Sequence, residues 1–284
     1  MDLTTYEKIT KTEKAARRYL LGFCWENHQR FCPKCRNRKV YNLAEKRKRC
    51  SRCGYTFHDF SRRFINVGNL NCRQWIRLLK LFELDVPPIH MPDQLGMASN
   101  TVYKAVNTLR MSILAHCLDA PIFLKHYGWE MGFPGIPEPE YSRGKSDFSP
   151  VFGVIKKGGK IFVDYLPHLD ESDVLHFKAN FYLKTAKLGN IVYTDGYKQY
   201  ETLIFYEGLV SRHHNISHRD KGLAVEINKD YWPATREKIK RLKGVMPHKF
   251  PLYLKEIEFR YNVRDKDLLE TLAGYLCAFV PKFE

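Results

Sequence analysis

Two pairs of cysteines constrain the fold of this chain more than any other feature of its sequence. Cys32 and Cys35 form one CxxC pair, and Cys50 and Cys53 form a second pair after fourteen intervening residues. Each pair can turn two thiolates toward one point, and two pairs supply the tetrahedral shell of four sulfurs that zinc prefers. A module this small needs the folding energy of a bound metal. The spacing therefore predicts a structural zinc ribbon over residues 31–60.

The segment between the two cysteine pairs is strongly basic. Its fourteen residues include seven arginines or lysines and are predicted to form a hairpin. A solvated face is one interpretation of this run, but beside a zinc ribbon we favour contact with DNA. A redox function is the alternative for a CxxC motif, and two pairs at this spacing argue against it. The four remaining cysteines are scattered, which fits a reducing compartment better than a disulfide framework.

The charge of the whole chain indicates a polyanionic partner. The 284 residues carry 47 Lys and Arg against 31 Asp and Glu, a formal net charge of +16. Nucleic acid is the simplest partner for so basic a chain. No apolar run approaches the roughly 18 residues of a membrane span, and the polar N-terminus has no signal-peptide core. We therefore expect a nucleic-acid-binding protein that has no membrane partner.

Helical patterns flank the zinc ribbon on both sides. Apolar residues at helix spacing over 12–30 predict a helical lead-in, which we place at residues 1–30. A second helical region is predicted over residues 61–120. Within it, an apolar stripe opposite basic residues predicts a helix over 71–82, which Pro87 and Pro88 would end.

The end of this helical region has the pattern of a helix-turn-helix motif. A short helix begins near Met91, a turn contains Gly96, and Ser99 would cap a second amphipathic helix. Val102, Val106 and Leu109 would face the core. The residues expected to face a DNA groove or its phosphates are Ser99, Asn100, Thr101, Tyr103 and Lys104. The alternative is an ordinary helical hairpin.

Residues 121–284 are predicted to form one α/β domain. The predicted strands are 122–130, 151–155, 160–165, 191–193 and 209–216. The predicted helices are 170–184, 198–207 and 224–262, the last with a break at Met246-Pro247. This is the element order of an RNase-H-like fold. The strand 191–193 ends in Thr194-Asp195-Gly196, and a carboxylate at the tip of a central strand can present a metal ligand. An ordinary Asp-Gly turn is the alternative.

The order of these modules resembles a known family. A zinc ribbon, a helix-turn-helix region and an RNase-H-like α/β domain, in this order, resemble the bacterial insertion-sequence transposases of the DDE type (ISXO-type), relatives of the eukaryotic Merlin elements. The motifs that carry the resemblance are CPxC…CxxCGxxF, Ser149–Gly153, Tyr193–Tyr197, Tyr231-Trp232, Lys240–Val245 and Tyr253–Asn262. The resemblance covers nearly the whole chain.

This resemblance implies both the chemistry and the partners of the protein. Such enzymes hold two Mg²⁺ ions on three acidic or amide ligands and transfer a phosphoryl group in line. It also implies a structural zinc ion, double-stranded DNA at the element ends as partner, a homo-oligomer on that DNA, and a bacterial cytoplasmic, nucleoid-associated location. Arg236 and Lys240 would follow the phosphate backbone, or else form a solvated face.

The catalytic ligands of the family match this sequence unevenly. Asp195 corresponds to the second ligand. Where the family has the Asp of an Asp-Glu pair, this chain has Trp129 followed by Glu130, and Trp cannot bind Mg²⁺. Glu130 does not simply replace the lost Asp, because neighbouring strand residues point to opposite faces, unless a bulge intervenes. Near the third position, Glu226 and Lys229 lie one helical turn apart.

Three functional interpretations follow from this match. The first, which we favour, is a transposase-like DNA-binding protein with an impaired two-metal site. The second is an active transposase that uses Asp195 and Glu226 with a non-standard first ligand. That ligand would be one of Glu130, Glu138, Glu140 and Asp147. The third is a domesticated DNA-binding regulator, which would bind one site without Mg²⁺.

Overall fold

The structure of this chain is a computed structural model. It describes residues 1–25, 29–117, 120, 124, 128, 132–134, 136, 151–157, 160–166, 190–197, 200–206, 238 and 249–281. These form two compact units. The first contains Met1–Pro137 together with Asp265–Glu284, and the second contains Glu138–Arg264. The second unit is therefore an insertion in the sequence of the first.

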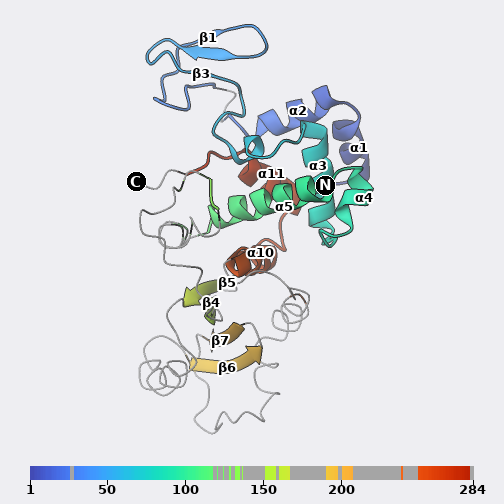
Figure 1. Cartoon of the computed structure of the whole chain (residues 1–284), viewed down its shortest axis with the longest axis vertical. Coiled ribbons are helices and arrows are strands. Elements are labelled where there is room, and N and C mark those ends of the chain that lie inside the picture. The colour runs from blue at the N-terminus through green and yellow to red at the C-terminus, as the bar shows by residue number, and fades with distance from the viewer. Residues whose placement is uncertain are drawn as a thin grey trace. The chain divides into compact units, whose positions relative to one another are not determined.

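Two short helices begin the first unit (Figure 1). Helix α1 is Leu3–Thr10 and helix α2 is Glu13–Gly22. The side chains of Asp2 and Thr12 cap them, each accepting a hydrogen bond from a backbone N–H three residues further along the chain. Ala16 and Leu20 of α2 are completely buried. The helix predicted within residues 12–30 is thus confirmed over α2.

The zinc-ribbon region is a small antiparallel sheet. Strands β1 (Val40–Asn42), β2 (Lys48–Cys50) and β3 (Thr56–Phe57) follow the order β1-β2-β3 (Figure 1). Strands β1 and β2 form the hairpin predicted between the cysteine pairs. Gly54 has a φ of 67° and donates its N–H to the Cys50 carbonyl at 3.1 Å, which closes the turn before β3.

Within residues 61–117, which the structure describes without a gap, the helical region after the ribbon contains three α-helices. A single 3₁₀ turn (Phe64–Asn66) leads to helix α3 (Cys72–Glu83), which confirms the helix predicted over 71–82. Asn71 and Gln74 form a capping box at its start. Helices α4 (Met91–Leu95) and α5 (Ser99–Leu114) follow. Helix α3 packs on α4, and α4 packs on α5.

The predicted cap of α5 is wrong. The N-cap residue is Ala98, and Ser99 is the first helical residue, so its hydroxyl does not close the N-terminus. Gly96 ends α4 with a φ of 64°, and only Met97 and Ala98 separate it from α5. Helical geometry therefore begins one residue earlier than the Ser99 pattern predicted. Val102, Val106 and Leu109 are completely buried, as expected.

The last helix of the chain belongs to the first unit. Helix α11 (Leu268–Cys277) packs against α2, α3 and α5, and its residues Leu269, Leu272 and Leu276 are completely buried. The sequence had placed residues 121–284 in a single domain. The contacts of α11 instead separate residues 265–284 from the inserted unit, because the apolar face of α11 completes the core of the N-terminal helices.

The second unit contains a mixed four-stranded sheet. Its strands are β4 (Val151–Lys157), β5 (Lys160–Leu166), β6 (Asn190–Tyr197) and β7 (Tyr200–Tyr206), in the order β5-β4-β7-β6. Strand β4 pairs antiparallel with β5, which confirms the predicted hairpin, and parallel with β7. Helix α10 (Phe250–Asn262) contacts β5 and confirms the end of the helix predicted over 224–262.

Two predicted elements of the α/β region are wrong. The helix predicted over 198–207 is instead strand β7, whose aromatic and β-branched residues pair with β6 on one side and β4 on the other. The strand predicted over 122–130 is helical at Leu124, whose carbonyl accepts a hydrogen bond from the Gly128 N–H at 2.9 Å. Short apolar runs fit both the helical period of 3.6 residues and the strand period of two, so periodicity alone does not distinguish a helix from a strand here.

The correction at β7 changes the position of Asp195. This residue lies within β6, opposite Thr202 of β7, with Gly196 and Tyr197 still in the strand. It is therefore not at the tip of a strand that leads into a helix. The strand predicted over 191–193 is confirmed and extended. The elements predicted over 170–184 and 209–216 lie outside the described residues, as does most of 224–248.

Candidate metal centre and nucleic-acid interface

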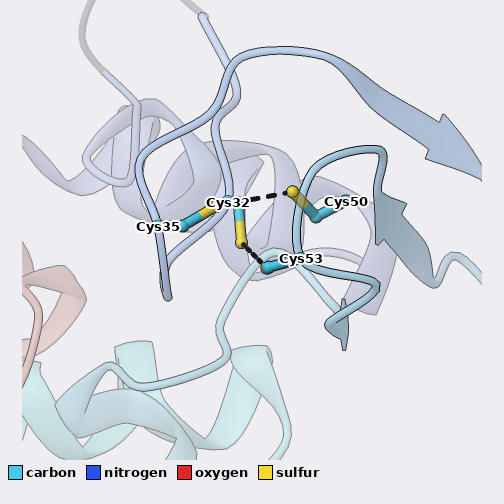
Figure 2. Close-up of side chains that lie close together, drawn as sticks. All are labelled: Cys32, Cys35, Cys50 and Cys53. Carbon is cyan, nitrogen blue, oxygen red and sulfur yellow. Dashed lines mark hydrogen bonds between the residues drawn. The ribbon is translucent and has the colours of Figure 1, made fainter.

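Four cysteine sulfurs converge at one point of the ribbon. One ligand atom from each of Cys32, Cys35, Cys50 and Cys53 lies within 4.8 Å of all the others. The Cys32 and Cys53 sulfurs are 3.6 Å apart, and the Cys35 and Cys50 sulfurs are 3.5 Å apart (Figure 2). A tetrahedral zinc ion with Zn–S bonds of about 2.3 Å requires sulfurs about 3.8 Å apart. The donor set therefore fits zinc in both chemistry and spacing.

Hydrogen bonds from N–H groups reach two of the sulfurs and lower the pKa of the Cys50 thiol. The Lys34 backbone N–H donates to the Cys32 Sγ at 3.4 Å, and the Arg52 N–H donates to the Cys50 Sγ at 3.3 Å. The Asn37 side-chain amide also donates to the Cys50 Sγ, at 3.6 Å. Burial raises the pKa of Cys50, but the N–H groups of Cys53 and Arg52 outweigh it and lower this pKa to about 6. Thiolates are the form that binds metal.

The ribbon presents a dense positive surface around this site. Glu45 is the one acidic residue between Lys34 and Arg52, and it pairs with Arg47 at 3.2 Å. The Tyr41 and Leu43 side chains of the hairpin are also exposed. The exposed cations of this surface are Lys34, Arg36, Arg38, Lys39, Lys46, Arg47, Arg49 and Arg52. We call this set the basic hairpin. Such a surface fits a polyanion.

The start of α5 presents a second polar surface. Asn100, Tyr103 and Lys104 are exposed and Thr101 is half-buried, whereas the opposite side of the helix is buried. Ser99 is exposed as well, without the capping role predicted for it. The structure thus brings the five predicted residues to the exposed side of one helix, directly after the Gly96 turn.

Two models of transposase families match the chain, one in its N-terminal part and one in the inserted unit. The transposase zinc-ribbon domain matches residues 11–56, and the ISXO2-like transposase domain matches residues 138–262. The first match ends at β3 and the second covers the strands of the inserted unit. The chain belongs to the IS1595-type transposases. A search of the curated proteins and of the solved structures found no match.

Of the predicted catalytic residues of this transposase, Asp195 is the one that lies within the described residues. Asp195 is placed in β6 by its backbone. The other predicted site residues lie outside the described residues, and these are Glu130, Glu226, Arg236 and Lys240. The same holds for Trp129, Lys229, Glu138, Glu140 and Asp147. The catalytic set therefore stays a prediction. Within the described residues, the four cysteines form the one group of potential metal ligands, and no helix is long and apolar enough to cross a membrane.

Sequence reasoning missed one buried residue beside the ribbon of the transposase. Asp59 is 4 % exposed, and its carboxylate pairs with Arg17, Arg30 and Lys48 at 3.0–3.1 Å. Burial raises the pKa of Asp59, but the hydrogen bond and charge of Lys48 and the charge of Arg30 hold it below its ordinary value. The buried aromatic residues Phe57 and Phe60 on either side of Asp59 were the signal available in the sequence.

Proposed function

We propose that this IS1595-type transposase binds double-stranded DNA at the ends of an insertion sequence through the basic hairpin and the start of α5. The observation that carries the proposal is the basic hairpin, eight exposed cations on a module whose four sulfurs fit zinc. Phosphate contacts of this kind release counterions and supply most of the affinity for DNA. Specificity requires contacts with base edges in a groove.

Helix α5 supports the specific part of this binding. Its first two turns expose Asn100, Tyr103 and Lys104, side chains that donate hydrogen bonds to bases or phosphates. The preceding helix α4 and the Gly96 turn supply the remaining parts of a helix-turn-helix motif. The proposal assigns α5 as the helix that enters the major groove. It also includes assembly as a homo-oligomer on DNA in the bacterial cytoplasm, associated with the nucleoid.

The inserted unit is proposed to be an RNase-H-like DDE domain with an impaired two-metal site. The match to the ISXO2-like transposase domain supports the DDE assignment, and the β4–β5 hairpin with α10 against β5 supports an α/β core. Strand β7 departs from the predicted helix in this core. The impairment follows from Trp129, because an indole supplies no ligand to the Mg²⁺ ions that phosphoryl transfer needs.

The test is nicking and strand transfer on duplex DNA that carries the terminal repeats flanking this coding sequence. The wild-type chain and Asp195→Ala are compared with Mg²⁺, with Mn²⁺ and without either. We expect protection of the repeats by both chains and cleavage by neither. Metal-dependent cleavage that Asp195→Ala abolishes would contradict the impairment and favour the active enzyme that uses Asp195 and Glu226. Absence of any preference for the repeats would contradict end binding.

The active enzyme is kept as the second candidate because one finding favours it. The ISXO2-like match covers residues 138–262, which include both Asp195 and Glu226. A domesticated regulator is distinguished by the same assay, since it would protect a single operator without cleavage and without preference for the repeats.

A further inference from the structure

Asp59 lies where three segments of the DNA-binding unit meet. Lys48 belongs to strand β2 of the ribbon, Arg17 belongs to helix α2, and Arg30 lies in the segment that enters the ribbon. The Asp59 Oδ1 contacts the Lys48 Nζ at 3.0 Å and the Arg30 Nε at 3.1 Å, and its Oδ2 contacts the Arg17 Nη2 at 3.1 Å. One carboxylate therefore joins the ribbon to the helices.

The two partners at the centre of this junction are withdrawn from water. The side chains of Asp59 and Lys48 are 5 % and 9 % exposed, whereas the other cations of the hairpin are exposed. Lys48 is thus the one buried cation of the basic run. A buried ion pair adds little net stability compared with apolar packing, and its best-attested use is to specify one geometry.

A second contact holds the ribbon from another side. Phe31, just before the first cysteine pair, packs edge-on against Trp25, and the two ring centroids are 5.2 Å apart. Arg36 lies over the rings of Phe31 and Phe279 at 5.0 and 5.1 Å. These contacts fix one point of the ribbon. The Asp59–Lys48 pair contacts strand β2, which is a second point of the ribbon.

We propose that Asp59 is a positioning residue that holds the basic hairpin in one orientation relative to α5, so that both contact a single stretch of duplex together. The inference rests on the proposed function. Arg17 belongs to α2, which packs on α3. Helix α3 packs on α4, and α4 packs on α5, so a series of direct helix contacts connects Arg17 with the proposed DNA-facing helix. Two DNA-contacting modules that are held rigidly lose less conformational entropy on binding than two modules that move independently, so the rigid pair binds more tightly.

The variant Asp59→Asn tests this proposal because it separates position from charge. The amide keeps the shape of the side chain but removes one negative charge, so the net charge of the chain rises by one. An electrostatic effect alone would strengthen binding to any duplex. Loss of positioning would instead weaken binding to the specific site by about tenfold to a hundredfold, since the second module would bind at a lower effective concentration.

The control variant is Glu13→Gln, which changes a carboxylate within the helices. The Glu13 carboxylate accepts hydrogen bonds from the backbone N–H groups of Cys72 and Arg73, both at 2.9 Å, and so joins α2 to α3 without touching the ribbon. Lys48→Met is a second test variant. It releases the ribbon from Asp59 while Arg17 and Arg30 still neutralise the carboxylate, and it lowers the net charge.

The experiment is hydroxyl-radical footprinting and titration of the full-length, zinc-loaded chain on a terminal-repeat duplex and on a scrambled duplex. No Mg²⁺ is added, and bound zinc is measured for every variant. We expect Asp59→Asn and Lys48→Met to keep their zinc, to shorten the protected region to one module and to lose specific affinity. The losses should not add in the double variant, because both changes break one contact. Glu13→Gln should keep the full footprint.

Two results would overturn the proposal. One is a wild-type footprint and affinity in Asp59→Asn, and the other is an equal shortening of the footprint in Glu13→Gln. If the wild-type chain itself fails to prefer the terminal repeat, end binding is wrong, and that failure is separate because it appears before any variant is compared.

Discussion

At the scale of single residues, the basic side chains of the ribbon form an exposed group and one buried member, Lys48. The cations on both sides of Lys48, which are Arg47 and Arg49, are exposed, whereas Lys48 is buried against Asp59. The alternation follows from the strand, because successive residues of β2 point to opposite faces. The same geometry buries Cys50 two residues later and turns it toward the other cysteines. Position in the strand therefore decides which cations are exposed.

Replacing Cys53 should remove the metal with little loss of packing. Cys53 is exposed, so Cys53→Ser deletes a sulfur ligand without leaving a cavity in the core. We expect bound zinc to fall from about one equivalent per chain to near zero, because zinc prefers four sulfur or nitrogen ligands in a structural site. Zinc is measured by atomic absorption after dialysis.

The loss of zinc should also unfold the ribbon strands. Amide hydrogen exchange in β1 and β2 should accelerate in Cys53→Ser, because the metal supplies the folding energy of the module. Cys117→Ser is the control, since Cys117 lies in the helical region after α5. An equivalent of zinc retained by Cys53→Ser would show that Cys53 is not a ligand.

At the scale of elements, the turn between α4 and α5 depends on one glycine. Gly96 has a φ of 64°, a left-handed conformation that an L-residue with a Cβ adopts at a cost. A Cβ at this position would meet no atom within 4 Å, so the cost is backbone strain alone. The glycine fixes where α4 ends and therefore the direction in which α5 begins.

The substitution Gly96→Ala should destabilise the helical region by about 1 kcal/mol through this strain. Gly96→Asn should cost less, because asparagine tolerates the left-handed region better than alanine. Urea unfolding followed by circular dichroism measures both. Equal stability of the wild type and Gly96→Ala would contradict the strain, and a larger loss in Gly96→Asn would show that side-chain volume matters here.

At the scale of the whole molecule, the two ends of the chain form one compact unit. Arg63 donates hydrogen bonds to the Cys24 and Cys277 carbonyls, and its guanidinium lies over the rings of Trp25 and Phe279 at 4.6 and 3.9 Å. It therefore connects segments separated by more than two hundred residues. The Val280 N–H adds a hydrogen bond to the Arg62 carbonyl at 2.9 Å.

A chain that ends at Arg264 should lose the stable fold of its N-terminal helices. The truncation removes α11, whose leucines complete the core beside α2, α3 and α5, and leaves Arg63 without Cys277 and Phe279. We expect rapid amide hydrogen exchange in α2 and α3, measured by mass spectrometry, because their apolar faces become exposed.

The full-length chain with Lys266→Ala and Glu270→Ala is the control for the truncation. Both residues are exposed and near or on α11, so protection of α2 and α3 should be unchanged. Wild-type protection in the truncated chain would show that residues 1–137 fold without the C-terminal segment.

The sequence by itself determined the local features of this transposase. The CxxC pairs predicted the four-sulfur cluster, because ligand chemistry and spacing are local properties. The apolar stripe predicted α3, and the glycine pattern predicted the helix pair α4–α5 except for the Ser99 cap. Alternation predicted the β4–β5 hairpin, whose strands are joined by a short connection.

Only the tertiary structure decided the features that depend on distant partners. Strand β7 was mistaken for a helix because its short apolar run fits both a helical and a strand period, and pairing with β4, far away in the sequence, decides between them. The burial of Lys48 and Asp59 required Arg17 from another element, and the membership of α11 in the first unit required the apolar faces of α2 and α3. Local patterns specify elements, whereas burial and charge pairing depend on which elements meet.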